Sequence, residues 1–477
     1  MMKIKDNFTR LLLLLLITFV ACIGLYGLPS TMLGYKIKKV DLFSDIRVVP
    51  QVATMDSLRA QLEQPVDVPV EVDDTPTSTL SADSARISSA RRDSISKLMN
   101  SMQTADPQGL HIEDYSADHT GLQRFFKALS NSHSRPVRIG FMGDSFIEGD
   151  IVVADLRNAM QQKFGGRGVG FVPVSSVSAQ YRPTINQKEK GWKMRSIIQD
   201  KSLPYTISGM LFETTGDEAS LSFQTVPLYA ALRKVSTLKF LYDRNEETVM
   251  QLAYNADIVV KILPPTQTIT QYSLSADSIT SGSFTFINAK GFRALGLALE
   301  DNTGVIVDNF ALRGNSGLPF GQLDAEVCRT FNDIRPYDLI ILQYGLNVAS
   351  EDMLDYNWYR SRMADVIRHL QQCFPETDFL LLGVSDRGNQ YDGNFSTMPS
   401  VLALLNTQRQ IAKQTQIPFW NMFGGMGGEN SIVKYVNNGW AGKDYTHLNF
   451  RGGREVAKSL MNALMLEKEL YNEMEND

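Results

Sequence analysis

Two short segments, far apart in the chain, carry side chains that could act together on an ester. In the first, Ser145 follows Gly143 and Asp144 at the end of a predicted strand and just before a predicted helix. The free N–H groups and the dipole of a helix start favour negative charge, so an oxyanion formed there would be stabilised. In the second, Asp444 lies three residues before His447 in a loop that precedes a helix. A carboxylate at that spacing can bind one ring nitrogen and leave the other to accept a serine proton.

Two further loops could supply hydrogen-bond donors to the oxyanion. Gly314 lies within Arg313–Gly317 after a predicted strand, and a glycine lets its backbone N–H approach a reacting oxygen closely. Asn347 follows another apolar strand, where its side-chain amide could also donate. Taken singly, each of the four segments is just as typical of an ordinary turn, cap or surface loop. Their joint presence in this order indicates a serine-based site.

The elements around these segments alternate as in a doubly wound α/β fold. Apolar runs predict strands near 137–141, 305–312, 337–345, 378–385 and 418–423. Helical periodicity predicts helices near 151–164, 323–334, 351–373, 401–415 and 454–473. We expect Asp150 to cap the first of these helices. Because parallel strands bring their carboxyl ends to one edge of a sheet, the four segments should meet at that edge.

The stretch 181–302 has a different pattern. Short apolar and β-branched runs are separated by polar turns, and helical periodicity is absent. Several short strands at this spacing predict a β-sandwich. We therefore expect an α/β domain built from 118–180 and 303–477, with an inserted, carbohydrate-binding-like sandwich at 181–302.

The amino-terminal part predicts a membrane address. Residues 11–28 contain no charge and can just span a bilayer as a single-pass signal anchor, with residues 1–10 in the cytoplasm. Cys22, within this stretch, leaves a lipoprotein anchor as the alternative. Residues 29–110 are rich in Pro, Ser, Thr and Asp and predict a juxtamembrane segment followed by a flexible linker. This organisation predicts a folded part held at the inner membrane on its periplasmic side.

Composition excludes several other classes of protein. The 477 residues include 47 basic and 52 acidic side chains, and this net charge of −5 does not favour nucleic acid as a partner. The hydrophobic share of 43% is enough for a folded core. Three cysteines without a Cys-x-x-Cys pair predict neither a disulfide framework nor a zinc site. We therefore expect no metal and no cofactor.

In this order and context, the four segments resemble the blocks of the SGNH (GDSL-like) hydrolases, which are named for Ser, Gly, Asn and His. The resemblance covers about 137–174 and 305–460. It implies a three-layer α/β/α, flavodoxin-like fold. It also implies that Ser145 is the nucleophile, His447 the base and Asp444 the partner of that base.

The same resemblance implies an oxyanion hole made by the N–H groups of Ser145 and Gly314 and by the amide of Asn347. Two positions depart from the family pattern. Val348 stands where an aspartate often follows the asparagine, which should not remove the donor. The second block is loose, so Gly317 is an alternative to Gly314.

The insertion of a sandwich into such a fold is similar in layout to bacterial peptidoglycan and polysaccharide O-acetylesterases. This layout implies a serine esterase that removes O-acetyl groups from a cell-envelope or extracellular polysaccharide through an acyl-enzyme intermediate. The same residues would serve an O-acetyltransferase working beside a membrane acyltransferase, and a non-catalytic glycan-binding scaffold is a third alternative. Trp440 and Trp192 could stack on sugar rings, whereas Trp358 and Trp420 are expected in the core.

Overall fold

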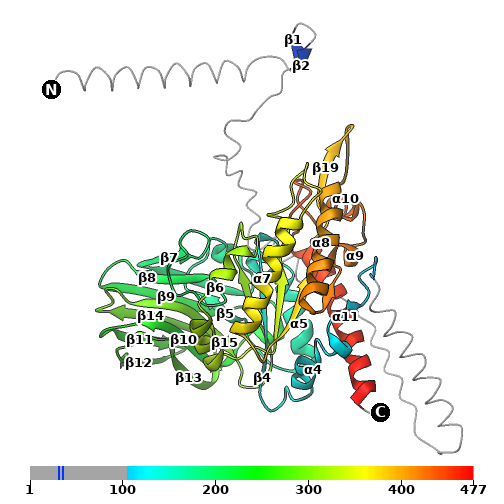
Figure 1. Cartoon of the computed structure of the whole chain (residues 1–477). Coiled ribbons are helices and arrows are strands. Elements are labelled where there is room, and N and C mark those ends of the chain that lie inside the picture. The colour runs from blue at the N-terminus through cyan, green and yellow to red at the C-terminus, as the bar shows by residue number, and fades with distance from the viewer. Residues whose placement is uncertain (1–30, 33–34, 37–104, 476–477) are drawn as a thin grey trace, which may run out of the picture. The chain divides into compact units, whose positions relative to one another are not determined.

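The computed structural model of the chain describes residues 31–32, 35–36 and 105–475 (Figure 1). The chain divides into two compact units, residues 1–54 and 55–477. In the first unit, β1 (Thr31–Met32) pairs with β2 (Tyr35–Lys36) in an antiparallel ladder. The predicted anchor at 11–28 and nearly all of the predicted linker lie outside the described residues. Among the residues that are described, no helix is long and apolar enough to cross a membrane.

The second unit contains a six-stranded central sheet. In spatial order its strands are β16 (Gly304–Ala311), β4 (Pro136–Gly143), β17 (Leu339–Gln343), β18 (Asp378–Leu382), β21 (Phe419–Trp420) and β3 (Ile112–Glu113). The first five are parallel, and only β3 at the edge runs antiparallel. Every residue of β17 and β18 is buried, as their continuous apolar runs predict. The parallel strands follow the 2-1-3-4-5 order of flavodoxin-like folds, so the predicted α/β class is confirmed.

Helices form two groups around this sheet (Figure 1). The first group is α6 (Ala325–Ile334), α7 (Asn357–Cys373) and α8 (Pro399–Thr415), which pack side by side. The second group is α4 (Gln123–Ser130), α5 (Val153–Phe164) and α11 (Phe450–Glu475). The crossover through α5 runs in the opposite direction along the sheet from those through α6, α7 and α8. Because such crossovers are right-handed, the two groups cover opposite faces.

Shorter elements connect these helices and strands. They are η1 (Ala117–His119), η2 (Ser145–Asp150), η3 (Ala179–Tyr181), η4 (Ala230–Leu232), η5 (Leu318–Gln322), α9 (Met422–Gly425), α10 (Ser431–Asn437), and the hairpin strands β19 (Gly388–Tyr391) and β20 (Asn394–Thr397). Several of them, namely η2, η5, the β19–β20 hairpin and α9, follow the carboxyl ends of central strands, which is the edge where the predicted site lies.

Residues 170–300 contribute two antiparallel sheets, which we call the two-sheet region. One sheet is formed by β13 (Thr270–Ile279), β10 (Val235–Arg244), β15 (Arg293–Glu300), β8 (Met210–Thr214) and β7 (Trp192–Ser196), with β5 (Gly170–Pro173) paired to β15. The other is formed by β12 (Asp257–Ile262), β11 (Val249–Tyr254), β14 (Ser281–Ile287), β9 (Glu218–Thr225) and β6 (Ile185–Lys190). Phe240 of the first sheet packs on Phe284 and Phe286 of the second, with ring centroids 5.3 and 4.9 Å apart. Because β5 belongs to this region, the region begins before residue 181.

A cluster of buried charges joins the two-sheet region to the central sheet. Glu300 of β15 receives ion pairs from Arg138 of β4 (2.8 Å), Lys239 of β10 (3.0 Å) and Arg335 (2.7 Å). Arg335 also binds Asp308 of β16 at 2.7 Å. Burial alone would raise the pKa of Glu300, but the three cations outweigh it and hold that pKa well below its usual range. The two parts therefore share one charged core.

Candidate active site

Ser145 begins η2, directly after the carboxyl end of β4. Gly143 is required there because a Cβ on it would lie 2.6 Å from Oε1 of Gln343 on the neighbouring strand. Asp144 caps η2, since its Oδ1 accepts the N–H of Phe146 at 2.9 Å. A tight packing requirement and a cap thus place the serine at the point where the strand order of the sheet reverses.

The structure brings Ser145, His447 and Asp444 together in the geometry of a catalytic triad. Ser145 Oγ lies 3.2 Å from His447 Nε2, and His447 Nδ1 lies 2.7 Å from Asp444 Oδ2. Asp444 Oδ1 also accepts the backbone N–H groups of Thr446 and His447, each at 3.1 Å. A carboxylate only accepts hydrogen bonds, so the proton belongs on Nδ1 and Nε2 is free to receive the proton of the serine.

Electrostatics favour an ionised Asp444 in this arrangement. Partial burial acts to raise the pKa of Asp444, but hydrogen bonds and the charge interaction from His447 outweigh it and lower the pKa. Both side chains are open to solvent, with 52% of Asp444 and 49% of His447 exposed. The base half of the triad therefore faces solvent, whereas Asp144, next to the serine, is fully buried.

Backbone donors of the predicted oxyanion hole are available. Gly314 has φ +73° and Gly317 has φ +86°, both in the left-handed region that favours glycine. The N–H groups of Ser145 and Gly314 have no hydrogen-bond partner within 105–475. The Gly317 N–H instead donates to Asn315 Oδ1 at 2.9 Å. Of the two predicted alternatives, only Gly314 therefore has an uncommitted N–H.

The Asn347 side chain lies between the first and second sequence blocks. Its Nδ2 donates to Asp144 Oδ2 at 2.9 Å and to the backbone oxygen of Asn315 at 3.1 Å. These contacts account for both amide hydrogens. Asn347 is therefore placed beside the serine as predicted, but it must exchange one of these bonds to donate to an oxyanion.

Asp144 is a buried carboxyl directly beneath the serine. Burial raises its pKa to about 6, although hydrogen bonds from Phe146 and Asn347 favour the ionised form. The sequence predicted only a turn residue here, because the burial arises from segments 199 or more residues away, including Gln343 and Asn347. Its protonation can therefore change near neutral pH and alter the acceptor that holds Asn347.

Asp150, at the end of η2, does not cap the following helix, contrary to our prediction. Its side chain is fully buried and binds Arg157 at 3.1 Å, Arg182 at 2.9 Å and Asn309 at 2.8 Å, and it also accepts the hydroxyl of Thr184. The hydrogen bonds and ion pairs from two arginines and one asparagine satisfy this carboxylate more fully than the N–H groups of one helix start could. Burial would raise the pKa of Asp150, but Arg157 and Arg182 hold it well below the usual range.

The Asp150 contacts support the serine-bearing turn from both sides. Asn309 of β16 also donates to the Ile147 oxygen within η2, at 2.9 Å. Arg182 and Thr184 lie at the start of the two-sheet region, 32 and 34 residues after Asp150. No local pattern could reveal these partners, so sequence reasoning missed them.

The four tryptophans differ in their surroundings. Trp192 packs against Phe286 (5.5 Å between centroids) inside the two-sheet region, and its indole N–H donates to the Ser220 oxygen at 2.9 Å. The structure thus gives the partly buried Trp192 a packing role, and its contact with a sugar stays a prediction. Trp440 is partly buried and packs edge to face on Tyr435, with ring centroids 5.2 Å apart. Trp420 is fully buried, as predicted. Trp358 is 43% exposed and lies beside Arg362. The core prediction for Trp358 is wrong because its side chain lies on the exposed side of α7, whereas Tyr359 and Met363 are buried.

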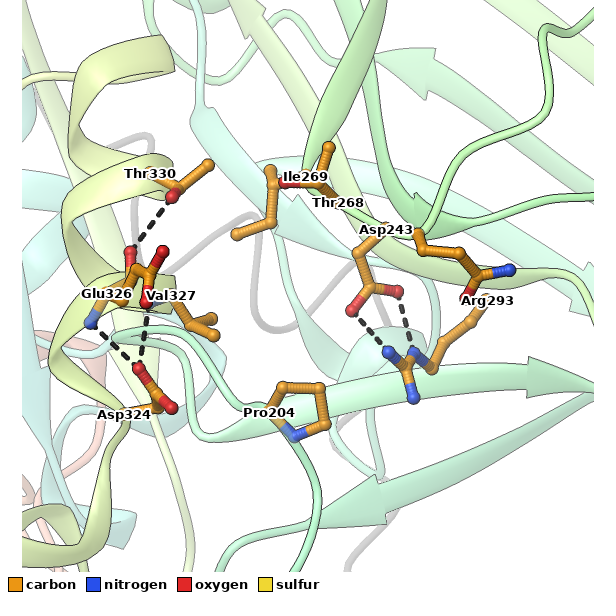
Figure 2. A pocket seen from close by; sticks show the side chains of 10 residues that line it. Pro204, Asp243, Thr268, Ile269, Arg293, Asp324, Glu326, Val327 and Thr330 are labelled. Atoms are coloured by element: carbon orange, nitrogen blue, oxygen red, sulfur yellow. Dashed lines mark hydrogen bonds and ion pairs between the residues drawn. The ribbon is translucent and has the colours of Figure 1, made fainter.

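A separate pocket of about 160 Å³ lies between α6 and the two-sheet region (Figure 2). Asp243 and Arg293 form a bidentate ion pair at 2.7 and 2.8 Å on one side. On the other side, Asp324 caps α6 through the N–H groups of Glu326 and Val327. None of the predicted catalytic residues lines this pocket, and the charged groups of Asp243, Arg293 and Asp324 already have the partners named above. Within 105–475 we also find no group of three or more His, Cys, Asp or Glu side chains placed to hold a metal ion.

Three solved structures are similar to this chain. A structure titled as a peptidoglycan O-acetylesterase in action is 20% identical, with a TM-score of 0.59, over 75% of this chain and 99% of that one. A family two carbohydrate esterase from Cellvibrio japonicus is 11% identical over 60% of this chain and 99% of that one, with a TM-score of 0.26. A salicylyl acyltransferase from a tetracycline biosynthetic pathway is 12% identical over 63% of this chain and 98% of that one, with a TM-score of 0.27. No family model and no curated protein matches the sequence.

Only the first of these likenesses is close enough to carry an argument, and at 20% identity it shows the fold. The shared fold agrees with the three-layer α/β architecture that the resemblance implied. On this fold, Ser145, His447 and Asp444 occupy the edge at which parallel sheets hold their ligands.

Proposed function

We propose that the protein is a serine esterase that removes O-acetyl groups from a cell-envelope or extracellular polysaccharide. The observation that carries this proposal is the continuous hydrogen-bonded chain from Ser145 through His447 to Asp444, beside two uncommitted backbone N–H groups. Nucleophile, base, orienting carboxylate and oxyanion donors together are the parts required for acyl transfer.

The reaction follows from this geometry. Ser145 Oγ attacks the ester carbonyl carbon while His447 Nε2 takes its proton, and the resulting oxyanion accepts the N–H groups of Ser145 and Gly314. As the tetrahedral intermediate collapses, the ester C–O bond breaks and His447 protonates the departing sugar oxygen. Water, deprotonated by His447, then attacks the acyl-enzyme, and the carboxylic acid leaves with Ser145 restored.

Asn347 would complete the oxyanion hole in the transition state. Its amide is held by the Asn315 oxygen and by Asp144, and a developing negative charge is a stronger acceptor than a neutral carbonyl. We propose that the amide N–H now bonded to the Asn315 oxygen redirects its hydrogen bond to the oxyanion, with the hydrogen remaining on Asn347. The bond to the Asp144 carboxylate would then keep the side chain oriented.

A polymeric substrate suits the exposure of this site. His447 and Asp444 are about half exposed, so an acetyl group projecting from a long glycan can approach without entering a closed pocket. The structural neighbour with the TM-score of 0.59 is titled as a peptidoglycan O-acetylesterase, which favours this substrate class. Trp440, partly exposed and close in sequence to Asp444, is the predicted aromatic side chain that could contact the sugar.

Hydrolysis of an aryl acetate and of O-acetylated glycans by the purified protein tests the proposal. We expect acetate release from both substrates, and covalent labelling of wild-type protein but not Ser145→Ala by a fluorophosphonate. Addition of a glycan acceptor provides the contrast. If acetate release falls and the acceptor becomes acetylated, the protein is instead the O-acetyltransferase of the alternative prediction. If the folded wild-type protein neither hydrolyses these substrates nor becomes labelled, the non-catalytic glycan-binding scaffold is the remaining alternative.

We also propose that residues 11–28 hold the protein in the inner membrane, with the folded part in the periplasm. An envelope polysaccharide would be reached from that side, and the charge-free composition of this stretch supports the anchor. Protease added to spheroplasts should then digest the folded part. Protection of that part in intact spheroplasts, with digestion after lysis, would contradict the proposed topology.

A further inference from the structure

The β19–β20 hairpin, found at the label β19 in Figure 1, follows the carboxyl end of β18. This is the edge of the sheet at which the triad also lies. Its two strands pair from Gly388–Thr397 to Tyr391–Asn394 across Asp392 and Gly393. Asp392 and Gly393 both have positive φ, the conformation that a tight hairpin turn requires. The hairpin is therefore a well-defined local unit, and it contacts the loop that carries Asp444 and His447.

One side of the hairpin packs against Tyr445, which lies between Asp444 and His447. The Phe395 ring is face to face with the Tyr445 ring, with centroids 3.6 Å apart and planes inclined by 5°. The Gly388 N–H donates to the Tyr445 oxygen at 2.9 Å. A Cβ on Gly388 would come within 3.3 Å of the Tyr445 Cβ, so the base of the hairpin also contacts this residue closely.

The backbone of Tyr445 is in a conformation that a tyrosine does not favour. Its φ is +52°, in the left-handed region, where a side chain crowds the backbone. This conformation folds the chain so that Asp444 Oδ1 can accept the N–H of His447 at 3.1 Å while Oδ2 faces the ring. The Gly442 N–H closes the loop on the His447 oxygen at 2.8 Å. The orientation of the base thus depends on holding Tyr445 in place.

The segment leading into the hairpin also contacts the loop that carries Asn347. Arg387 Nη1 donates to the oxygens of Leu346 and Ala349 at 3.4 and 3.3 Å. The preceding Asp386 is fully buried and accepts the N–H of Ile432 at 2.8 Å. The hairpin is consequently anchored at its base and links the oxyanion side of the site to the base side.

We propose that Phe395 is a positioning residue for the reaction, acting through Tyr445 on the Asp444–His447 pair. This inference rests on the proposed esterase function. Stacking of the two rings would offset the unfavourable backbone conformation of Tyr445 and fix the imidazole within reach of Ser145. Phe395 touches none of the reacting atoms in this arrangement.

The test compares ring-deleting and ring-keeping variants in the full-length protein. Phe395→Ala and Tyr445→Gly remove the stack, and the glycine still accepts a positive φ. We expect each to lower kcat for an aryl acetate by about tenfold while KM changes by less than about twofold, because binding is retained and orientation is lost. Phe395→Tyr and Tyr445→Phe keep two stacked rings and should retain activity. The double variant Phe395→Ala/Tyr445→Gly should be no slower than either single one, because both remove the same interaction.

Gln390→Ala is the matched control in the same hairpin, because the exposed Gln390 side chain donates to the hairpin's own Gly393 oxygen at 3.1 Å. It should behave as wild type. The downfield proton resonance of the His447 Nδ1–H, measured by NMR, reports the bond to Asp444 without requiring turnover. We expect it to broaden or disappear in Phe395→Ala and to persist in Phe395→Tyr and Gln390→Ala.

These readouts separate the two proposals. If the wild-type protein is inactive, the esterase function is contradicted. If the His447 Nδ1–H resonance is nevertheless lost in Phe395→Ala, the positioning role of Phe395 is retained. An active Phe395→Ala with unchanged kcat and resonance would overturn the positioning role alone. Additive losses in the double variant would also overturn it, since the rings would then act independently.

Discussion

The central-sheet region and the two-sheet region contribute to the site in different ways. All the proposed catalytic side chains lie in loops at the carboxyl edge of the central sheet. The two-sheet region supplies none of them, but its Arg182 and Thr184 bind Asp150 at the end of the serine-bearing turn. Its Glu300 likewise receives Arg138 from β4. A region that is inserted in the sequence can thus support the structure of the fold that it interrupts.

This difference also changes what is expected of the insertion as a carbohydrate-binding module. A freely appended module would have a surface of its own facing the core and few buried charges at the boundary. Here the boundary contains carboxylates that are fully buried and paired across it. Removing the region would leave Asp150 without Arg182, and Arg138 and Arg335 without Glu300, so the core is not expected to fold without it.

The largest expected effect tests whether the chemistry belongs to the central region alone. Ser145→Ala and His447→Ala should each lower kcat for an aryl acetate by ~10⁴ or more, since loss of a triad member has effects of that order. Asp444→Asn should reduce kcat less, because the serine, base and backbone donors stay in place. Circular dichroism and thermal unfolding should be unchanged. A Ser145→Ala variant with near-normal turnover would place the chemistry elsewhere in the molecule.

The next effect tests whether the two-sheet region supports the serine turn. Arg182→Met leaves the buried Asp150 carboxylate with one fewer cation, and breaking such a pair costs about 3–5 kcal/mol in the free energy of unfolding. Arg195→Met is the matched control in the same region, because its pair with Glu213 is partly exposed and worth ~1 kcal/mol or less. Urea unfolding measures both. Equal small losses would show that the two regions are only loosely joined.

A third effect concerns the buried carboxyl under the serine. The pKa of Asp144 is raised to about 6, so the native state keeps its proton to a higher pH than the unfolded chain does. The free energy of unfolding should therefore fall as the pH rises from about 4 to about 6, by ~3 kcal/mol at most. Asp144→Asn should show a correspondingly weaker decline.

Other groups titrate near this range, including Asp378, with a pKa raised by burial to about 7, so the difference between wild type and Asp144→Asn is the quantity to measure. Urea unfolding of both proteins between pH 4 and pH 7 provides it. Parallel stability curves for the two would show that Asp144 is ionised throughout that range.

The smallest effect is expected for Trp358, and Trp420 of the same region is the buried reference against which it is measured. Trp358→Ala removes a side chain that is 43% exposed and should change stability by about 0.5 kcal/mol or less. Trp420→Ala removes a fully buried one, with a loss of about 3–5 kcal/mol. Thermal unfolding should rank them in this order. A large loss for Trp358→Ala would mean that it has a packing role that its exposure does not reveal.

The sequence by itself determined the α/β class and the four segments of the candidate site. Both are local properties: apolar runs and helical periodicity mark the elements, and Asp444 and His447 are only three residues apart. Parallel strands bring their carboxyl ends to one edge, so segments as distant as Ser145 and His447, 302 residues apart, could be predicted to meet. The predicted anchor at 11–28 stays a prediction.

Only the tertiary structure decided which polar groups are buried and which partners they have. Asp150 is suited to cap a helix in sequence, yet Arg182 and Asn309, which are 32 and 159 residues away, make it a buried ion-pair centre. The orientation of Asn347 toward Asp144 and the stacking of Phe395 on Tyr445 have the same origin. Burial depends on the whole assembly of elements, and a charge's behaviour depends on its burial, so no local pattern contains this information.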